Sequence, residues 1–129
     1  MKKLSIVTVN LNNAAGLEKT IKSVFEQNSS DYEYIIIDGG STDGSRELIK
    51  KYENKLVYWV SEKDKGMYAA IQKGFSKSTG EIMGWLNSDD MLHPKSLFSI
   101  AEVLSLEGVK WIQGMPNVFD EQGRTVKAD

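Results

Sequence analysis

The sequence predicts an α/β fold in which a mainly parallel, Rossmann-like sheet carries helices on both faces. Three observations support this prediction. Short apolar runs rich in β-branched residues alternate with segments that have helical periodicity, and polar or glycine-rich turns follow several of the runs. Sheets of this kind bind ligands beyond the carboxyl ends of their strands, so functional side chains are expected where the apolar runs end.

The first half of the chain contains three predicted strands and two helices. Leu4–Val9 is β-branched and apolar, which predicts a buried strand. Apolar residues at helical spacing then predict a helix over roughly 14–27. Tyr34–Ile37 is the second predicted strand, and a second helix follows from about Ser45 to Tyr52. Leu56–Val60 is the third predicted strand.

The second half continues the alternation. Gly66–Lys77 is the third predicted helix, and Ile82–Leu86 is the fourth strand. Pro94 opens a fourth helix at its first turn, where a missing N–H does no harm. A fifth strand is predicted from about Lys110 to Met115, and Asp120–Gly123 is a turn signal before a last short strand.

Composition is typical of one soluble globular domain. Of the 129 residues, 40% are hydrophobic and 26% charged, and the formal net charge is -2. This charge gives no strong positive field to attract nucleic acid, so we expect no nucleic-acid partner, and the absence of cysteine excludes disulfides and thiolate chemistry. No stretch approaches the roughly 20 apolar residues of a membrane span. We therefore expect a cytoplasmic protein. The three tryptophans lie on predicted strands, so we expect them in the core: Trp59, Trp85 and Trp111.

Amides and a hydroxyl cluster at the end of the first strand. Thr8 and Asn10, followed by Asn12 and Asn13, offer hydrogen bonds to a base or ribose. An asparagine-rich turn with a helix cap is the alternative, and for this motif alone it is the better explanation.

The second strand runs directly into Asp38-Gly39-Gly40-Ser41-Thr42-Asp43-Gly44. The glycines allow the backbone to turn sharply and approach a ligand, and Asp43 is placed to cap the next helix. A plain strand-turn-helix junction is the alternative. For Asp38 we favour a functional role, as the acceptor for an imino or amide N–H of a base.

Two adjacent carboxylates follow the fourth strand, in Trp85-Leu86-Asn87-Ser88-Asp89-Asp90. Such a pair repels itself unless a cation or hydrogen-bond donors lie between. Magnesium commonly takes one or two carboxylates and completes its shell with water and substrate phosphates. A solvated turn before the next helix explains this motif equally well.

A charged loop precedes the third predicted helix and contains Asp64 and Gly66. The helix amino terminus at Gly66 is suited to a pyrophosphate. The neighbouring Glu62 and Lys63 are better explained as solvated charges. His93 is the only histidine; a loop position without function is its simplest explanation, and a metal or phosphate contact is a minor alternative.

Together and in this order, the motifs resemble the family 2 glycosyltransferases of the GT-A fold, in the version found in bacterial members that build surface polysaccharides. The matching segments are Ile6-Val7-Thr8-Val9-Asn10, Ile37-Asp38-Gly39-Gly40-Ser41-Thr42-Asp43-Gly44, Asp64-Lys65-Gly66 with Ala70 and Gly74, and Leu86-Asn87-Ser88-Asp89-Asp90. The resemblance covers nearly the whole chain, as the nucleotide-binding half of that fold.

The resemblance implies a site for a nucleoside-diphosphate sugar, with a UDP-sugar favoured. Thr8, Asn10 and Asp38 would hold the base, and the Asp64–Gly66 region would lie near the nucleotide or its diphosphate. Asp89 and Asp90 would hold ribose and a divalent ion, Mg²⁺ or Mn²⁺. Family members invert the anomeric centre, with a carboxylate as general base toward the hydroxyl of a glycan or lipid-linked acceptor.

The sequence departs from the family's pattern at two positions and in length. Many members have a second acid where this chain has Gly39, and many have aspartate where it has Asn87, whose amide can still bond ribose or a metal-bound water. The family's base and acceptor-binding elements come later than the acidic motif. We therefore expect residues 1–129 to be the nucleotide-sugar-binding part, with the acceptor-binding part absent and the base beyond Asp129.

Two other functions remain open. One is a non-catalytic nucleotide-binding module that acts with a partner chain; sugar transfer assayed with and without a second polypeptide separates it from an enzyme. The other is a phospho-acceptor receiver domain, which would need an acidic pair where this chain has Val9-Asn10-Leu11-Asn12. Peripheral association of the full enzyme with the inner face of the membrane is a further open alternative.

Overall fold

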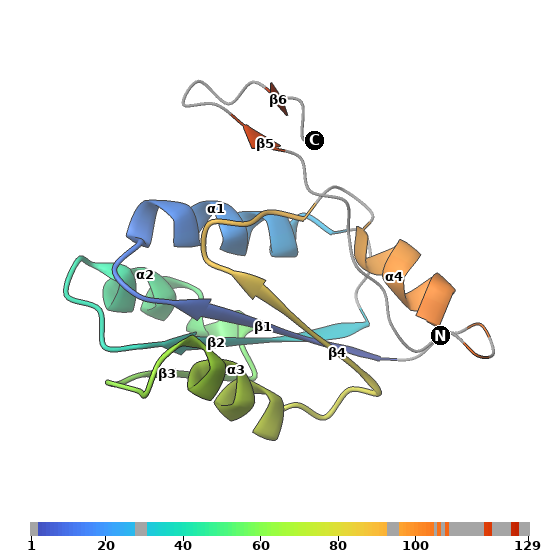
Figure 1. Ribbon diagram of the computed structural model, residues 1–129, viewed down its shortest axis with the longest axis horizontal. Coiled ribbons are helices and arrows are strands. Elements are labelled where there is room, and N and C mark those ends of the chain that lie inside the picture. The colour runs from blue at the N-terminus through green and yellow to red at the C-terminus, as the bar shows by residue number, and fades with distance from the viewer. Residues whose placement is uncertain are drawn as a thin grey trace.

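A four-stranded sheet lies between helices in the computed structural model, which describes residues 3–27, 31–92, 96–104, 106, 108, 118–119 and 125–126 (Figure 1). Its strands are β1 (Leu4–Asn10), β2 (Tyr32–Asp38), β3 (Tyr58–Ser61) and β4 (Ile82–Asn87). All are parallel to their neighbours, in the order β3-β2-β1-β4. The predicted parallel sheet with helices on both faces is confirmed.

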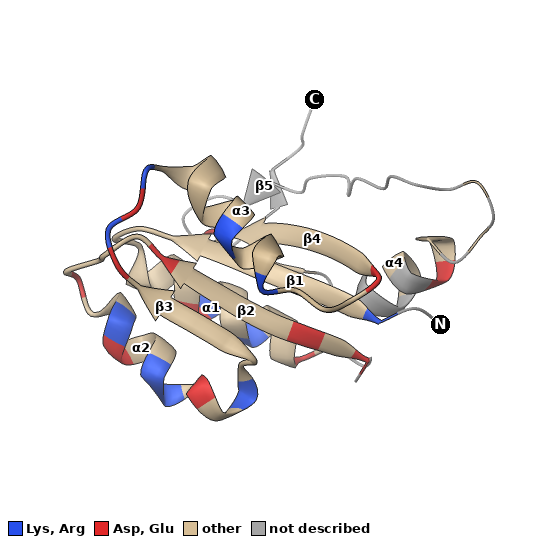
Figure 2. Cartoon of the chain, turned by 90° about the horizontal axis from the view of Figure 1, so that it is seen from below, with Lys and Arg blue, Asp and Glu red and all other residues tan. Residues whose placement is uncertain are grey.

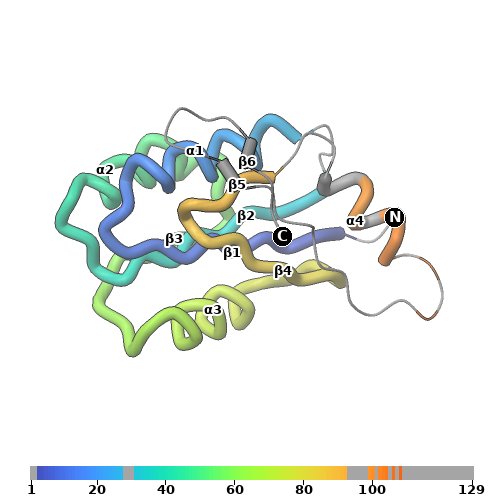
Figure 3. Tube along the Cα trace, turned by 45° about the horizontal axis from the view of Figure 1, so that its top comes forward, coloured from blue at the N-terminus to red at the C-terminus, as the bar shows by residue number. Residues whose placement is uncertain are grey.

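The two faces of the sheet are covered by different helices, as Figures 1 and 3 show. On one face, α1 (Ala14–Phe25) and α2 (Ser45–Lys51) pack against the side chains of alternate strand residues, including Ile6 and Ile36. On the other face, α3 (Met67–Ser76) packs on Val7, Val9, Ile35 and Ile37. Successive side chains of β1 and β2 point to opposite faces of the sheet, so each strand contributes alternate residues to two separate hydrophobic cores.

Helix α3 approaches the sheet closely because a glycine faces it. A Cβ added at Gly74 would collide with the side chain of Val7. Gly74 thus allows the second half of α3 to pack closely on β1, while the start of the helix lies beside the carboxyl end of β1, where the predicted functional residues gather.

The helix after β4 is α4 (Ser96–Leu104), and its Ile100 packs against the core on the α1 face. Farther along, β5 (Val118–Phe119) and β6 (Thr125–Val126) form an antiparallel pair on either side of the predicted turn. The predicted strand at 110–115, the turn at 120–123, and the positions of His93, Pro94 and Trp111 lie outside the described residues.

Two expectations from the sequence are corrected by the structure. The third strand begins at Tyr58 and not at Leu56, and a 3-10 turn, η1 (Glu53–Lys55), lies before it. Trp85 is 50% exposed, although we expected it in the core. It lies on β4, the outermost strand on its side of the sheet among the described residues, and packs edge-on against Phe75 of α3 with ring centroids 6.4 Å apart. Trp59 is partly buried against the core.

The surface charge is mixed. Figure 2 shows Lys and Arg interspersed with acidic residues along α2 and η1. None of the helices in the described ranges is long and apolar enough to cross a membrane.

A buried carboxylate ties the sheet together at the end opposite to the predicted site. The carboxylate of Glu33, on β2, accepts hydrogen bonds from the Ser5 hydroxyl (2.7 Å), the Thr79 amide (2.6 Å) and the Thr79 hydroxyl (2.7 Å). Lys3 lies 3.4 Å from it. Burial alone would raise the pKa of Glu33, but the bonds from Thr79, Ser5 and Lys3 outweigh it and lower the pKa from 4.5 to about 2.

Replacing Glu33 with glutamine is expected to lower the free energy of unfolding by about 2–3 kcal/mol at neutral pH, because donors aimed at a carboxylate would meet an amide. The folded-state pKa of Glu33 is depressed, so its contribution is complete above pH 4.5 and is lost as the pH falls toward about 2. Urea unfolding of both proteins at neutral and acid pH measures this. Glu81→Gln, at an exposed position, is the control. Equal stability of Glu33→Gln and the parent at neutral pH would contradict the prediction.

Candidate functional site

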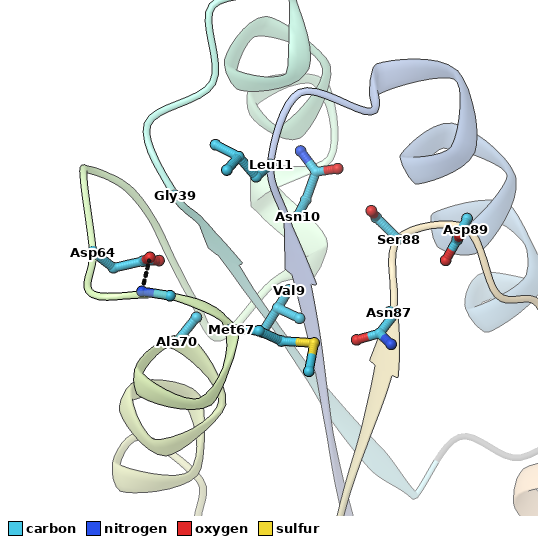
Figure 4. A pocket seen from close by; sticks show the side chains of 11 residues that line it. Val9, Asn10, Leu11, Gly39, Asp64, Met67, Ala70, Asn87, Ser88 and Asp89 are labelled. Carbon is cyan, nitrogen blue, oxygen red and sulfur yellow. Dashed lines mark hydrogen bonds between the residues drawn. The ribbon is translucent and has the colours of Figure 1, made fainter.

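A cavity of about 300 Å³ opens at the carboxyl ends of β1 and β4, beside the start of α3 (Figure 4). Its walls come from the end of β1, the turn after β2, the loop before α3, and the turn after β4. Segments distant in sequence meet here because parallel strands end at one edge of the sheet.

The cavity contains five of the eight predicted site residues. Asn10, Asp64, Gly66, Asn87 and Asp89 line it. The other three, namely Thr8, Asp38 and Asp90, are not among its lining residues. The sequence motifs therefore converge on one place, but their members lie at different depths.

Asp38 is fully buried, with 0% of its surface exposed, and its carboxylate is surrounded by donors. One oxygen accepts from the Asn10 amide (2.8 Å) and the Ser41 hydroxyl (2.6 Å). The other accepts from the Ser61 hydroxyl (2.7 Å) and the backbone amides of Ser41 (2.8 Å) and Gly40 (3.2 Å). Asp38 thereby joins the ends of β1, β2 and β3.

The pKa of Asp38 reflects this environment. Burial acts to raise the pKa, but hydrogen bonds from Ser41, Ser61 and Asn10 outweigh it and lower the pKa below its ordinary value. The side chain is therefore a carboxylate at neutral pH. Its four lone-pair positions already face five donors, so it is a structural centre behind the cavity wall.

Thr8 is also buried behind the wall. Its hydroxyl lies 2.7 Å from the hydroxyl of Tyr34, on the face of the sheet that α1 covers. Thr8 thus fills the core beside the site.

Two buried amide oxygens lack partners among the described residues, and both belong to residues that line the cavity: Oδ1 of Asn10 and Oδ1 of Asn87. The orientation of Asn10 is fixed, since its Nδ2 donates to Asp38 and a flipped amide would turn an oxygen toward that carboxylate. Buried acceptors without a donor are costly, so each is suited to a donor from a ligand, such as a sugar hydroxyl or a bound water.

The acidic turn after β4 is held by polar groups of α1. The Thr20 hydroxyl donates to the backbone carbonyl of Asp90 (2.6 Å), and the Ser23 hydroxyl accepts from the Leu92 amide (3.1 Å). Burial raises the pKa of the Asp90 carboxyl, and the charge of the adjacent Asp89 raises it further. A cation at this turn would relieve both effects.

The loop before α3 is shaped by Gly66 and Asp64. Gly66 has a φ of 114°, a conformation that residues with a Cβ rarely adopt, and helix α3 begins directly after it. One oxygen of Asp64 accepts the Gly66 amide at 3.0 Å. Figure 4 shows Asp64 and Gly39 on one side of the pocket, and Ser88 and Asp89 on the other.

Other residues of the site were not anticipated. Leu11 and Met67 contribute exposed apolar side chains to the wall, and Ser88 contributes its hydroxyl. Ser61, which bonds Asp38, comes directly after the predicted third strand. Its place at a strand end was the available signal, but a single serine is too common there to be distinctive.

The acidic turn can hold a divalent ion only together with a bound ligand, because the turn itself supplies too few metal ligands. In the described part of the chain, no group of three or more His, Cys, Asp or Glu side chains is placed to hold a metal. Asp89 and Asp90 supply two adjacent carboxylates, and the buried oxygen of Asn87, which has no partner among the described residues, can accept a hydrogen bond from a metal-bound water. This donor set suits Mg²⁺ or Mn²⁺ that completes its shell with ligand phosphates and water.

Comparison with known proteins identifies relatives along nearly the whole chain. A family model described as glycosyl transferase family 2 matches residues 5–127. An uncharacterized glycosyltransferase of Nostoc sp. is 32% identical, with 96% of this chain and 39% of the relative covered. The poly(ribitol-phosphate) beta-N-acetylglucosaminyltransferase TarP of Staphylococcus aureus is 33% identical, with 100% of this chain and 44% of the relative covered. The chain thus spans about two fifths of the length of these curated relatives.

Solved structures share the fold at lower identity. Residues 1–349 of S. aureus TarS, in complex with UDP-GlcNAc, match with a TM-score of 0.70 and 20% identity, covering 91% of this chain and 40% of that one. The mannosyltransferase PcManGT of Pyrobaculum calidifontis, in complex with GDP-Man and Mn²⁺, matches with a TM-score of 0.69 and 20% identity. This match covers 78% of this chain and 31% of that one.

Proposed function

The chain belongs to glycosyl transferase family 2, and on that premise we propose that it binds a nucleoside-diphosphate sugar for an inverting transfer reaction. A UDP-sugar is the favoured donor. The observation that carries the proposal is the cavity at the strand ends, where two unpartnered amide oxygens and an acidic turn face one space. TarS, which shares the fold, is known in complex with UDP-GlcNAc.

The nucleotide is proposed to lie across the cavity. Its diphosphate lies toward the acidic turn after β4, across the cavity from Asp64, where a bound divalent ion would neutralise its charge. The ribose hydroxyls are the proposed donors to the unpartnered oxygens of Asn10 and Asn87. Asp38 and Thr8 do not contact the nucleotide in this proposal; they are buried behind the cavity wall and stabilise it.

Asp90, aided by Asp89, is the proposed ligand pair for Mg²⁺ or Mn²⁺. When bound, the ion supplies Lewis-acid neutralisation of the leaving nucleoside diphosphate. The chain's own contribution is positional, because Thr20 and Ser23 of α1 fix the backbone of the turn that carries the two carboxylates. PcManGT, a structural neighbour, is known in complex with Mn²⁺.

The acceptor hydroxyl requires a general base within hydrogen-bond reach. In this proposal Asp89 and Asp90 are engaged with metal and ribose, so neither of them is free to act as that base. A glycan or lipid-linked acceptor, and with it polysaccharide or glycolipid synthesis at the inner membrane face, is proposed from the functions that relatives such as TarP have in their names.

Nucleotide titration tests the proposal. In calorimetry with UDP, GDP and ADP at equal Mn²⁺, we expect UDP or GDP to bind at least about tenfold more tightly than ADP, because uracil and guanine carry a ring N–H that adenine lacks. Inorganic pyrophosphate is the control for binding through phosphates alone. Preference for ADP, or equal affinity for pyrophosphate and all three nucleotides, would contradict a base-reading donor site.

A further inference from the structure

Reading a base requires an acceptor that is free, and Asp38 is not. All five of its donors come from the protein, and none of its surface is exposed. A base N–H would have to displace one of these donors and enter behind the cavity wall. The acceptor that faces the ligand must therefore be sought among the residues that line the cavity.

Asp64 has the required geometry. One of its oxygens is occupied by the Gly66 amide at 3.0 Å, which orients the side chain. The other oxygen lies over Gly39, only 3.3 Å from the point where a Cβ at that position would stand. The absence of a side chain at Gly39 leaves this space to the Asp64 carboxylate. The Leu11 side chain borders the same space, 3.4 Å from that point.

We infer that Asp64 is the residue that determines base specificity, as the acceptor for the ring N–H of uracil or guanine. The inference rests on the proposed function, since it places a nucleotide in this cavity. Leu11 offers an apolar contact to the face of the base. The base then lies on the Asp64 and Gly39 side, and the diphosphate lies toward Asp89 on the other side (Figure 4).

Asp89 is the other carboxylate among the lining residues, and its neighbourhood suits a different ligand. It lies directly beside Asp90, so the pair attracts a cation more than a neutral base. Asp64 has no acidic neighbour of that kind in its loop, where Lys63 and Lys65 flank it.

Methylated nucleotides test the inference directly. UDP and GDP are each titrated beside the analogue methylated at the ring nitrogen that carries the proton, N3 of uracil or N1 of guanine. The parent chain should bind the methylated form of its preferred nucleotide at least about 30-fold more weakly, as expected for a lost hydrogen bond to a charged group.

The variant Asp64→Asn is then titrated with the same pair. It retains an oxygen for the Gly66 amide, so an NH₂ group replaces the oxygen that faces the base. Because an NH₂ group cannot accept the base N–H, discrimination against the methylated form should fall to about threefold or less. Glu62→Gln is the matched control, because Glu62 is on the same loop but pairs with Lys73 at 2.9 Å outside the cavity lining. It should discriminate as the parent does.

The outcomes separate the two proposals. Failure of the parent to bind UDP or GDP would overturn the proposed function and the inference with it. Equal binding of the plain and methylated forms by the parent would overturn the inference while leaving donor binding intact. Full discrimination by Asp64→Asn would also overturn it, and would direct attention to another acceptor.

Discussion

Replacing Asp90 with asparagine is expected to abolish the dependence of nucleotide binding on Mg²⁺ or Mn²⁺ while leaving the fold intact. The substitution removes one of two adjacent carboxylates and with it the charge that holds the ion. In saturating Mn²⁺, UDP affinity should fall on the order of 100-fold, because losing even an outer-shell partner of a metal ligand costs about 10–100-fold and Asp90 is proposed to bind the ion directly. Without metal, parent and variant should bind UDP equally weakly.

Calorimetry with and without Mn²⁺ measures this difference, and circular dichroism confirms the fold. Asp89→Asn should produce a smaller loss, because Asp90 remains. Burial and the charge of Asp89 raise the pKa of Asp90, so metal affinity should begin to fall at a higher pH than for an ordinary carboxylate. An unchanged metal response in Asp90→Asn would place the ion elsewhere.

The periodicity of the sequence was sufficient to predict most of the fold. Continuous β-branched runs, such as the Ile35–Ile37 segment, occur because both faces of β2 are buried. The predicted helices at 14–27 and 66–77 were confirmed to within a few residues, since α1 and α3 have apolar faces at helical spacing. The prediction that Trp85 is in the core was wrong, because the strand pattern does not reveal that β4 is the outermost of the described strands on its side of the sheet.

The place of the site was also predictable, because parallel strands end at one edge and the motifs follow those ends. The division of roles within it was not. Asp38 and Asp64 are both polar residues near strand ends, and only the structure shows that one is enclosed by five donors while the other faces the cavity. Ser61, which supplies one of those donors, comes from β3, and its closeness to Asp38 cannot be read from its position in the sequence.

The structural role of Asp38 predicts the second large effect, a loss of stability in the variant Asp38→Asn. An amide of the same shape cannot accept from all five donors, and its NH₂ would face the Ser41 or Gly40 amide. We expect a loss of about 3 kcal/mol in the free energy of unfolding, the usual cost of leaving buried polar groups unsatisfied around a former charge. UDP binding should disappear as well, since the ends of β1, β2 and β3 lose the group that joins them.

The contribution of Asp38 to the free energy of unfolding should change with pH in a definite direction. The folded-state pKa of Asp38 is lowered, so its stabilising contribution is complete well above the ordinary value of 3.8 and is lost as the pH falls below it. The stability difference between parent and Asp38→Asn should therefore be full at neutral pH and shrink in acid. Urea unfolding at several pH values measures it. Asp64→Asn is the informative comparison, because a partly exposed side chain should cost only ~0.5 kcal/mol on substitution. If Asp38→Asn were as stable as the parent and lost only its discrimination against the methylated base, Asp38 would be the residue that reads the base, and the role assigned to Asp64 would be wrong.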